Sequence, residues 1–308
     1  MVESVVSKTV IDTLRELVSA EAVHPKEPMH KHTTFRIGGP ADCLVEIEST
    51  EALRRVQRYL RLVEIPYTIT GNGSNLLVSD LGYRGVILQL GSRFAEVRVE
   101  GNTVTAQAGA LLSRIAKTAL EHGLTGFEFA AGIPGTAGGA VVMNAGAYGG
   151  EMKQVIQSVT VLDPEGEELV LDNETMEFGY RTSVLKRRPL VVTEITLQLT
   201  PGDPVQIRER MEELARQRRE KQPLEYPSAG STFKRPEGYF AGKLIMDANL
   251  RGFQIGGARV SDKHCGFVIN AGGATACDVA ALMAEVQRRV EEQSGVRLEP
   301  EVILLGEF

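Results

Sequence analysis

Residues 131–150 read AGIPGTAGGAVVMNAGAYGG, and this glycine-rich stretch decides the choice of fold. The uncharged run begins at Phe129 and is long enough to cross a bilayer. Its many glycines, Pro134 and Asn144 nevertheless make it a poor, weakly hydrophobic helix. Glycine lets the main chain approach a large planar or charged ligand without interference from Cβ. We therefore expect the stretch to bring backbone close to a ligand rather than to anchor the chain in a membrane.

A second glycine cluster lies upstream, where residues 71–76 read GNGSNL after a predicted strand. The cluster lacks the third glycine of G-x-G-x-x-G, and no helix pattern follows it, which excludes a Rossmann turn. Two glycines and short polar residues after a strand can instead form a nest of N–H groups that holds a diphosphate. An ordinary tight turn is the alternative interpretation. Together with Arg36 in TFRIGG, the two clusters indicate one extended ligand with a diphosphate in its middle.

The composition is that of an ordinary globular protein of about two domains, with 308 residues, 43% of them hydrophobic and 24% charged. The formal net charge of −6 gives no general attraction to nucleic acid or to anionic lipid. Charges interrupt the apolar stripe of the predicted helix at residues 4–18, which argues against a signal segment. Three scattered cysteines and the adjacent pair His264–Cys265 predict neither a disulfide framework nor a metal site. We expect a reducing, cytoplasmic location.

The order of the predicted elements divides the chain into three parts. The first alternates strand and helix, the second is dominated by short strands around one helix that ends at Gly123, and the third is mainly helical. The turn-rich segment TPGDP at 200–204 indicates the boundary before the third part. The predicted strands include residues 43–48 and 65–70 and the apolar end of LEPEVILLGEF, and the predicted helices are residues 51–61, 111–123, 205–221, 241–248 and 275–293. Ser49 and Thr50 are the candidates for the cap of the helix at 51–61. Apolar stripes are predicted on the helix at 4–18 (Val6, Val10, Leu14 and Leu17) and on the last helix (Val279, Leu282, Met283, Val286 and Val290).

Seven motifs occur in the order found in one family of flavoenzymes. They are TTFRIGG (33–39), GNGSNLLV (71–78), AGIPGTAGGAVVMNAGAYG (131–149), GYRTS (179–183), AGSTFKRP (229–236), AGKLIMDANLRG (241–252) and LEPEV (298–302). On these motifs the chain resembles the UDP-N-acetylenolpyruvoylglucosamine reductase family, over about residues 33–306. The span between Arg181 and Ser231 has no room for the tyrosine-bearing insertion of the longer family type, so the chain resembles the shorter, type II form.

The resemblance implies an α+β fold. It consists of a two-lobed FAD-binding unit of the PCMH/vanillyl-alcohol-oxidase type and a C-terminal α+β substrate-binding domain. We expect the first lobe to comprise residues 1–72 with 302–308, the second lobe residues 73–202, and the substrate-binding domain residues 203–301. The final strand would return to the first lobe and so bring Glu301 into the active site.

The resemblance also implies a reaction. The enzyme would reduce UDP-N-acetylglucosamine enolpyruvate to UDP-N-acetylmuramate in peptidoglycan precursor synthesis, with FAD as cofactor and NADPH as the hydride donor. Its partner would be this small nucleotide sugar, with no nucleic acid and no membrane insertion. The preference for NADPH over NADH and the oligomeric state stay open, and a monomer is compatible with the sequence.

By resemblance, the catalytic residues are Ser231, Arg181 and Glu301. A guanidinium is planar and always charged, which suits the carboxylate of the enolpyruvyl group. Glu301 beside that carboxylate must be protonated, with its pKa raised by burial and neighbours, to donate a hydrogen bond to the developing enolate. The carbanionic carbon is so basic that a serine hydroxyl serves as its proton donor. Taken singly, Arg181 and Glu301 are explained equally well by a surface salt bridge, and Ser231 by ordinary loop chemistry.

The resemblance further assigns binding residues. Those for the cofactor are Arg36, Gly71, Asn72, Gly73, Ser74, Asn75, Gly132, Ile133, Pro134, Gly135, Gly138 and Gly146. Those for the substrate are Arg235, Tyr239, Lys243, Arg251 and His264.

Two alternatives stay open on the residues alone. One is another FAD oxidoreductase of the same fold that acts on a small hydroxy acid or alcohol, which would not require Ser231 with Arg181 and Glu301. The other is a non-catalytic nucleotide-sugar binding protein, which would not require the FAD-binding glycine clusters. A serine hydrolase has no support, since no G-x-S-x-G elbow occurs.

Overall fold

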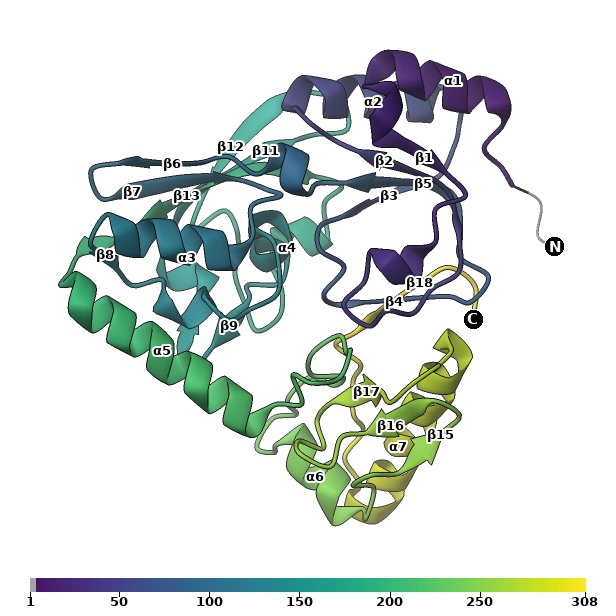
Figure 1. The fold of residues 1–308 in the computed structure, drawn as a ribbon, viewed down its shortest axis with the longest axis vertical. Helices are drawn as coiled ribbons and strands as arrows, with labels where there is room; N and C mark the ends of the chain where they lie inside the picture. The colour runs from purple at the N-terminus through teal and green to yellow at the C-terminus, as the bar shows by residue number, and fades with distance from the viewer. Residues whose placement is uncertain (1–3) are drawn as a thin grey trace.

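A four-stranded sheet of order β1-β2-β5-β3 forms the first part of the computed structural model, which describes residues 4–308 (Figure 1). Strand β2 runs antiparallel to β1 and parallel to β5, and β5 runs parallel to β3. The parallel strands therefore end at the same edge of the sheet. The bounds are β1 (Val23–Pro25), β2 (Ala41–Glu46), β3 (Tyr67–Thr70) and β5 (Tyr83–Gln89).

Helices α1 (Lys8–Leu17) and α2 (Thr50–Leu62) pack against each other and share a core with this sheet. The predicted cap of α2 is confirmed, because the Oγ of Ser49 accepts a hydrogen bond from Ala52 N at 3.1 Å. On α1 the predicted apolar stripe is buried at Val10 and Leu14. The helix itself begins after Ser7, so that Val6 of the predicted stripe lies outside the helix, although it is buried.

A two-stranded parallel sheet of β4 (Leu76–Val78) and β18 (Ile303–Leu305) lies between the first sheet and the C-terminal part of the chain (Figure 1). Val78 and Leu305 pack with the core of the first sheet, whereas Leu77 packs with the C-terminal core. The final strand thus pairs with β4, which belongs to the span expected to form the second lobe, and its return to the first lobe stays a prediction. The lobe boundary expected between residues 72 and 73 does not coincide with the edge of the first sheet, since β5 follows it in the chain. The division into lobes stays a prediction.

The second part is a five-stranded antiparallel sheet of order β12-β11-β13-β7-β6. Its strands are β6 (Val97–Glu100), β7 (Thr103–Gln107), β11 (Ile156–Leu162), β12 (Glu168–Asp172) and β13 (Val191–Gln198). The predicted helix in this part is α3 (Leu112–Glu121), and Gly123 follows it with φ +64°. Antiparallel hairpins explain why this part reads as closely spaced strands.

The glycine-rich stretch 131–150 contains the short helix α4 (Ala137–Val142) and a hairpin of β9 (Gly146–Ala147) and β10 (Gly150–Glu151). A Cβ at Gly146 would lie 2.6 Å from Gly150 O, so this glycine is needed for the close pairing of the hairpin. Within residues 4–308, no helix combines the length and the apolar character that crossing a membrane requires.

The predicted boundary TPGDP is tied to the second part rather than loose. Strand β14 (Thr200–Pro201) pairs with β8 (Leu124–Thr125), and Gly202 N donates a hydrogen bond to Gly123 O at 2.8 Å. Asp203 then caps helix α5 (Pro204–Lys221), with its Oδ1 accepting from Val205 N at 2.9 Å.

The C-terminal part, green to yellow in Figure 1, lies below the two larger sheets. A small antiparallel sheet of β15 (Gln254–Ile255), β16 (Ala258–Val260) and β17 (Val268–Asn270) packs on α7 (Ala276–Ser294), which also contacts α6 (Ala241–Asp247). A capping box of Thr275 and Asp278 begins α7. Its predicted apolar stripe is confirmed, since Val279, Leu282, Met283, Val286 and Val290 are all buried.

Candidate functional site

A cavity of about 390 Å³ opens at the edge where the parallel strands β3 and β5 end. Gly71 and Asn72, which follow β3, line it together with Gly91 and Ser92, which follow β5. In sheets with parallel strands, ligands bind in the crevice beyond the carboxyl ends of the strands. The location of the cavity therefore agrees with the ligand-binding role predicted for the first glycine cluster.

The loop that follows β3 is pressed against two other segments. A Cβ at Gly71 would lie 2.2 Å from Thr136 Oγ1, and one at Gly73 would lie 2.1 Å from His32 O. Gly73 also has φ +60°, a conformation that side chains rarely adopt. The two glycines thus allow the loop to lie directly on its neighbours.

Replacing Gly73 with alanine is expected to cost about 1–3 kcal/mol more of unfolding free energy than replacing Gly101 with alanine. Gly101 has nearly the same φ, +59°, but its Cβ would meet nothing within 4 Å. The backbone strain is therefore matched, and the difference isolates the clash with His32. Denaturant unfolding of both variants measures this difference, and flavin content reports whether the loop still binds the cofactor. Equal losses in the two variants would contradict the close packing.

The two glycine clusters form one wall. The Nδ2 of Asn72 donates a hydrogen bond to Pro134 O at 2.7 Å, which joins the clusters directly. The backbone N–H groups of residues 71–75, and those of Gly132, Gly135 and Thr136, donate no hydrogen bond to any group within residues 4–308. Free N–H groups in such a glycine-rich loop can bind an anion such as a diphosphate.

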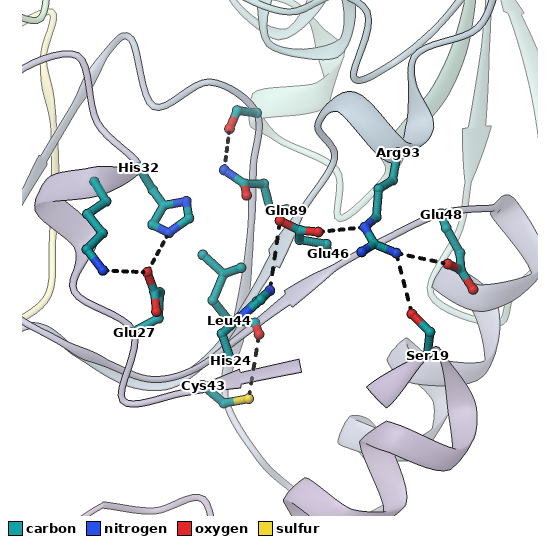
Figure 2. Close-up of polar contacts among 12 residues, drawn as sticks. Ser19, His24, Glu27, His32, Cys43, Leu44, Glu46, Glu48, Gln89 and Arg93 are labelled. Carbon is teal, nitrogen blue, oxygen red and sulfur yellow. Dashed lines mark hydrogen bonds and ion pairs between the residues drawn. The ribbon is translucent and has the colours of Figure 1, made fainter. Parts of the chain in front are cut away.

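Basic side chains lie at the same cavity. Lys31 and His32 line it from one side and Arg114 from another. Figure 2 shows His32 directed at Glu27, whose Oε1 lies 3.1 Å from His32 Nε2 and 3.7 Å from Lys31 Nζ. Burial raises the pKa of Glu27, but the hydrogen bond from His32 and the charges of Lys31 and His32 outweigh it, so the pKa is below its usual value. Glu27 therefore stays ionised and fixes both side chains at the cavity.

The loop after β5 is held from the first sheet. Arg93 donates to Glu46 at 2.7 Å and lies 3.7 Å from Glu48, and its NH1 is 3.5 Å from Ser19 Oγ (Figure 2). In addition, Gln89 Nε2 donates to Gly71 O at 3.3 Å. These contacts fix Gly91 and Ser92 at the cavity relative to the loop after β3.

The residues at this wall fit the diphosphate of FAD, because they combine free N–H groups, glycines without room for Cβ, and nearby cations. Of the predicted cofactor residues, Gly71 and Asn72 line the cavity, and Gly73, Ser74, Pro134 and Gly135 adjoin them in the two loops. Thr33, Thr34 and Thr136 also line the cavity, and the sequence did not single them out. Thr33 and Thr34 belong to the motif TTFRIGG, so their position beside Arg36 could have indicated them. Arg114 belongs to none of the motifs, and nothing in the sequence indicated it.

Other predicted cofactor residues have structural tasks. Gly138 packs on Ala108, since a Cβ at Gly138 would lie 3.0 Å from the Cβ of Ala108. The Nδ2 of Asn75 donates to Glu301 O at 3.0 Å rather than pointing at the cavity wall. Arg36 is exposed, with φ +54°. Ile133 packs against the main core, and Gly132 lies against the side chain of Arg218. For these residues, contact with the cofactor stays a prediction.

Arg181 and Glu301 meet although 120 residues separate them. The distance from Arg181 Nε to Glu301 Oε1 is 2.7 Å, and only 24% and 13% of the two side chains are exposed. Glu301 N donates to Thr232 O at 2.8 Å, while Glu301 O accepts the amide of Asn75. Glu301 is therefore fixed from both the glycine loop and the segment that contains Ser231.

The pKa of Glu301 is raised above its usual value, chiefly because the carboxyl group is buried. The positive charges of Arg181, Lys186 and Lys234 oppose the shift without cancelling it. This direction agrees with the sequence prediction that the carboxyl group must carry a proton.

Ser231 lies next to this pair. It follows Gly230, which has φ +77°, and precedes Thr232, whose carbonyl oxygen accepts from Glu301 N. The strand-like segment around Phe233 pairs with Pro300 and so runs beside the residue before Glu301. The backbone thus brings the three predicted catalytic residues to one place.

The five predicted substrate residues gather around α6. Tyr239 precedes the helix and accepts from Arg235 Nε at 3.2 Å, and Lys243 forms an ion pair with Asp247 within it. Arg251 donates to Asp262 O at 2.6 Å and to Met246 Sδ of α6 at 3.1 Å. His264 lies against Gly242, and burial lowers its pKa, which favours the neutral ring.

Two aromatic residues that the sequence did not single out organise Arg235. Its guanidinium lies 3.9 Å from the ring centroid of Phe240, and its backbone N donates to Tyr180 Oη at 3.0 Å. Tyr180 directly precedes Arg181, so it joins the predicted substrate residues to the catalytic pair. Adjacency to predicted residues was the only signal for either aromatic residue.

Comparison with known proteins identifies relatives over nearly the whole chain. Residues 222–305 match the family model described as UDP-N-acetylenolpyruvoylglucosamine reductase, C-terminal domain, and residues 41–172 match an FAD binding domain. The chain is 52% identical over 301 residues to UDP-N-acetylenolpyruvoylglucosamine reductase of Caldanaerobacter subterraneus subsp. tengcongensis, which covers 98% of this chain and 99% of the relative.

Solved structures agree with this result. UDP-N-acetylenolpyruvylglucosamine reductase from Thermus caldophilus superposes with a TM-score of 0.79 at 38% identity, over 91% of this chain and 98% of that one. 4-Ethylphenol oxidase from Gulosibacter chungangensis shares the fold over 66% of this chain and 45% of its own, with a TM-score of 0.50 at 18% identity. The predicted α+β fold with an FAD-binding unit is confirmed.

Proposed function

The chain belongs to the UDP-N-acetylenolpyruvoylglucosamine reductase family, and we propose that it reduces UDP-N-acetylglucosamine enolpyruvate to UDP-N-acetylmuramate with NADPH as the electron donor. The junction of Arg181, Glu301 and the Ser231 segment beside the glycine loops is the observation that carries the proposal. An isolated surface ion pair would not require two side chains that are both mostly buried.

FAD, when bound, supplies the hydride chemistry of this reaction. The free N–H groups of residues 71–75 and of Gly132, Gly135 and Thr136 would hold its diphosphate, beside Thr33 and Thr34, which line the cavity. Lys31, which Glu27 keeps at the cavity, would add positive charge.

Arg181 would bind the carboxylate of the enolpyruvyl group. Its guanidinium remains positively charged throughout the reaction and is preorganised by Glu301. Negative charge develops on the substrate as the double bond is reduced, so a fixed positive charge here is more effective in the transition state than in the ground state.

Glu301 would hold a proton beside the same carboxylate. When the substrate carboxylate takes over the guanidinium, Glu301 loses its ion pair and gains an anionic neighbour. Both changes raise its pKa further. The protonated carboxyl group can then donate a hydrogen bond to the enolate oxygen.

Ser231 would give the proton to carbon. The glycine before it, with φ +77°, has open space around its Cβ position, so the segment presents the serine without crowding. A hydroxyl group suffices as the acid, because the carbanionic carbon is far more basic than the serine alkoxide that the proton transfer leaves behind. The nucleotide portion would extend toward α6, where Arg235 is held by Phe240 and Tyr180.

The proposal includes a cytoplasmic location and a place in cell-wall precursor synthesis. Cys43, Cys265 and Cys277 are all free thiols, as expected in a reducing compartment.

The purified protein is expected to be yellow, with flavin absorbance near ~450 nm, and to oxidise NADPH rapidly only when the enolpyruvyl nucleotide is present. A colourless protein that still binds the nucleotide sugar would favour a non-catalytic binding protein. A flavoprotein that oxidises a hydroxy acid or alcohol and ignores the enolpyruvyl nucleotide would favour the other FAD oxidoreductase. NADH in place of NADPH, at matched concentrations, tests the donor preference.

A further inference from the structure

The last turn of helix α5 carries three cations, Arg218, Arg219 and Lys221, and Arg218 lies against the glycine-rich stretch 131–150. Cations in the last turn stabilise a helix through its dipole, and this explains Arg219 and Lys221, which are exposed. Arg218 differs, because it is partly buried and its side chain lies on the backbone of Gly132. A Cβ at Gly132 would lie 3.2 Å from Arg218 Cδ and 3.4 Å from its NH1.

The guanidinium of Arg218 has no carboxylate partner among the described residues. The salt bridges on α5 join Arg216 to Glu213 and Glu220. Burial lowers the pKa of Arg218, and the phenol of Tyr148 opposes this shift without cancelling it. Removing part of a guanidinium from water without a counterion costs free energy, so an anion is expected to complete the site.

The surroundings favour a phosphate as that anion. Gly132 N donates no hydrogen bond within residues 4–308, and Pro134 of the same turn accepts the amide of Asn72 from the other glycine loop. A planar, five-donor guanidinium beside a free backbone N–H binds a phosphate group well. A purely structural task, stem packing over the glycine, would need the apolar part of the side chain but not the charge.

We propose that Arg218 is a phosphate-binding residue of this site, which holds a phosphate group of a nucleotide against the turn at Gly132. The inference rests on the proposed function and adds a contact from α5, outside the seven motifs that indicated the family. The phosphate can belong to the bound FAD or to one of the two diffusible nucleotides, and the experiment separates these sources.

The test compares wild type with Arg218→Gln and Arg218→Lys in three binding measurements on the purified flavoprotein. The first follows flavin released on dilution. The second is the NADPH dependence of flavin reduction, and the third is the dependence of flavin reoxidation on the enolpyruvyl nucleotide. Arg218→Gln is expected to weaken at least one affinity by about tenfold or more, since a charge-assisted hydrogen bond is lost. The affected measurement identifies the nucleotide. Arg218→Lys keeps the charge but not the planar, forked donor group, so its affinity should lie between those of wild type and Arg218→Gln.

Arg208→Gln is the matched control, because Arg208 is an exposed arginine on the same helix. It should change none of the three affinities. If Arg218→Gln and Arg208→Gln both leave all three within about twofold of wild type, the proposal is wrong, while an active wild type would keep the proposed function intact. Should the glutamine variant not fold, Arg218→Lys decides, and unchanged affinities in that variant overturn the proposal.

Discussion

Replacing Ser231 with alanine is expected to leave flavin reduction by NADPH intact and to slow flavin reoxidation by the enolpyruvyl nucleotide by ~10²–10⁴-fold. The reason is that the hydroxyl group would be needed only for protonation of carbon, which follows hydride transfer. Ser231 lies at the junction with Glu301, through the hydrogen bond from Glu301 N to Thr232 O. Stopped-flow absorbance of the flavin separates the two half-reactions.

Ser228→Ala is the matched control in the same segment. The carbonyl of Ser228 accepts a hydrogen bond from Thr34, and this contact survives the substitution. The substitution removes only the long hydrogen bond of 3.4 Å from Gly230 N to Ser228 Oγ. The control should therefore resemble wild type in both half-reactions. Reoxidation of the Ser231 variant at the wild-type rate would exclude Ser231 as the proton donor, and a loss in the NADPH half-reaction would point to a damaged site instead.

Replacing Glu301 with alanine is expected to reduce kcat by ~10²–10³-fold, because a preorganised hydrogen-bond donor to the developing enolate is lost. Glu301→Gln should retain part of the activity, since the amide can still donate a hydrogen bond to the substrate. The more specific result concerns pH. The pKa of Glu301 is raised by burial, so its protonated form persists to higher pH in the folded protein than in the unfolded chain.

The wild-type value of kcat/KM should fall as pH rises through the folded pKa of Glu301, and this limb should be absent in Glu301→Gln. Because the substrate carboxylate would displace Arg181 from Glu301, the corresponding limb in kcat should lie at higher pH. Stability follows the same sign: a raised carboxyl pKa contributes stability that is lost as pH rises from the unfolded to the folded value. Wild type should therefore lose stability relative to Glu301→Gln over that range.

Glu299→Gln is the control, because Glu299 is 68% exposed and forms an ion pair with Lys234. Its pH profile should match that of wild type. Identical profiles for wild type and Glu301→Gln would show that the protonation of Glu301 has no role in the reaction.

The local elements were predictable because they depend on short patterns. The stripe of α7 and the caps of α2 and α3 needed only spacing and cap residues. The parallel pairing of β5 with β2 and β3 was not predictable. Its hydrogen bonds join segments that are far apart in the chain, and no local sequence pattern indicates which strands pair. The boundary placed at residue 72 was chosen without that pairing.

The site was predictable to the extent that motifs mark it. From the residues alone, Arg181 and Glu301 were compatible with a surface ion pair, and only the family resemblance brought them together. The structure adds that both side chains are mostly buried, which the sequence does not reveal. Arg114 and Arg218 carried no signal, because each belongs to a helix whose charges are typical of a solvated face. Which charges of such a helix face inward depends on tertiary packing, which no local pattern reports.

The parallel pairing of β18 with β4 also sets the order in which the site can mature during translation. Glu301 and the strand after it leave the ribosome later than every other helix and strand of the described chain. Strand β4 is made much earlier but cannot form its parallel pairing until β18 is present. Until then Leu77 and Val78 have no strand beside them, and Asn75 lacks the carbonyl that its side chain binds. The nascent protein can therefore build most of its core beforehand, but the predicted catalytic residues come together only when the last strand pairs with β4.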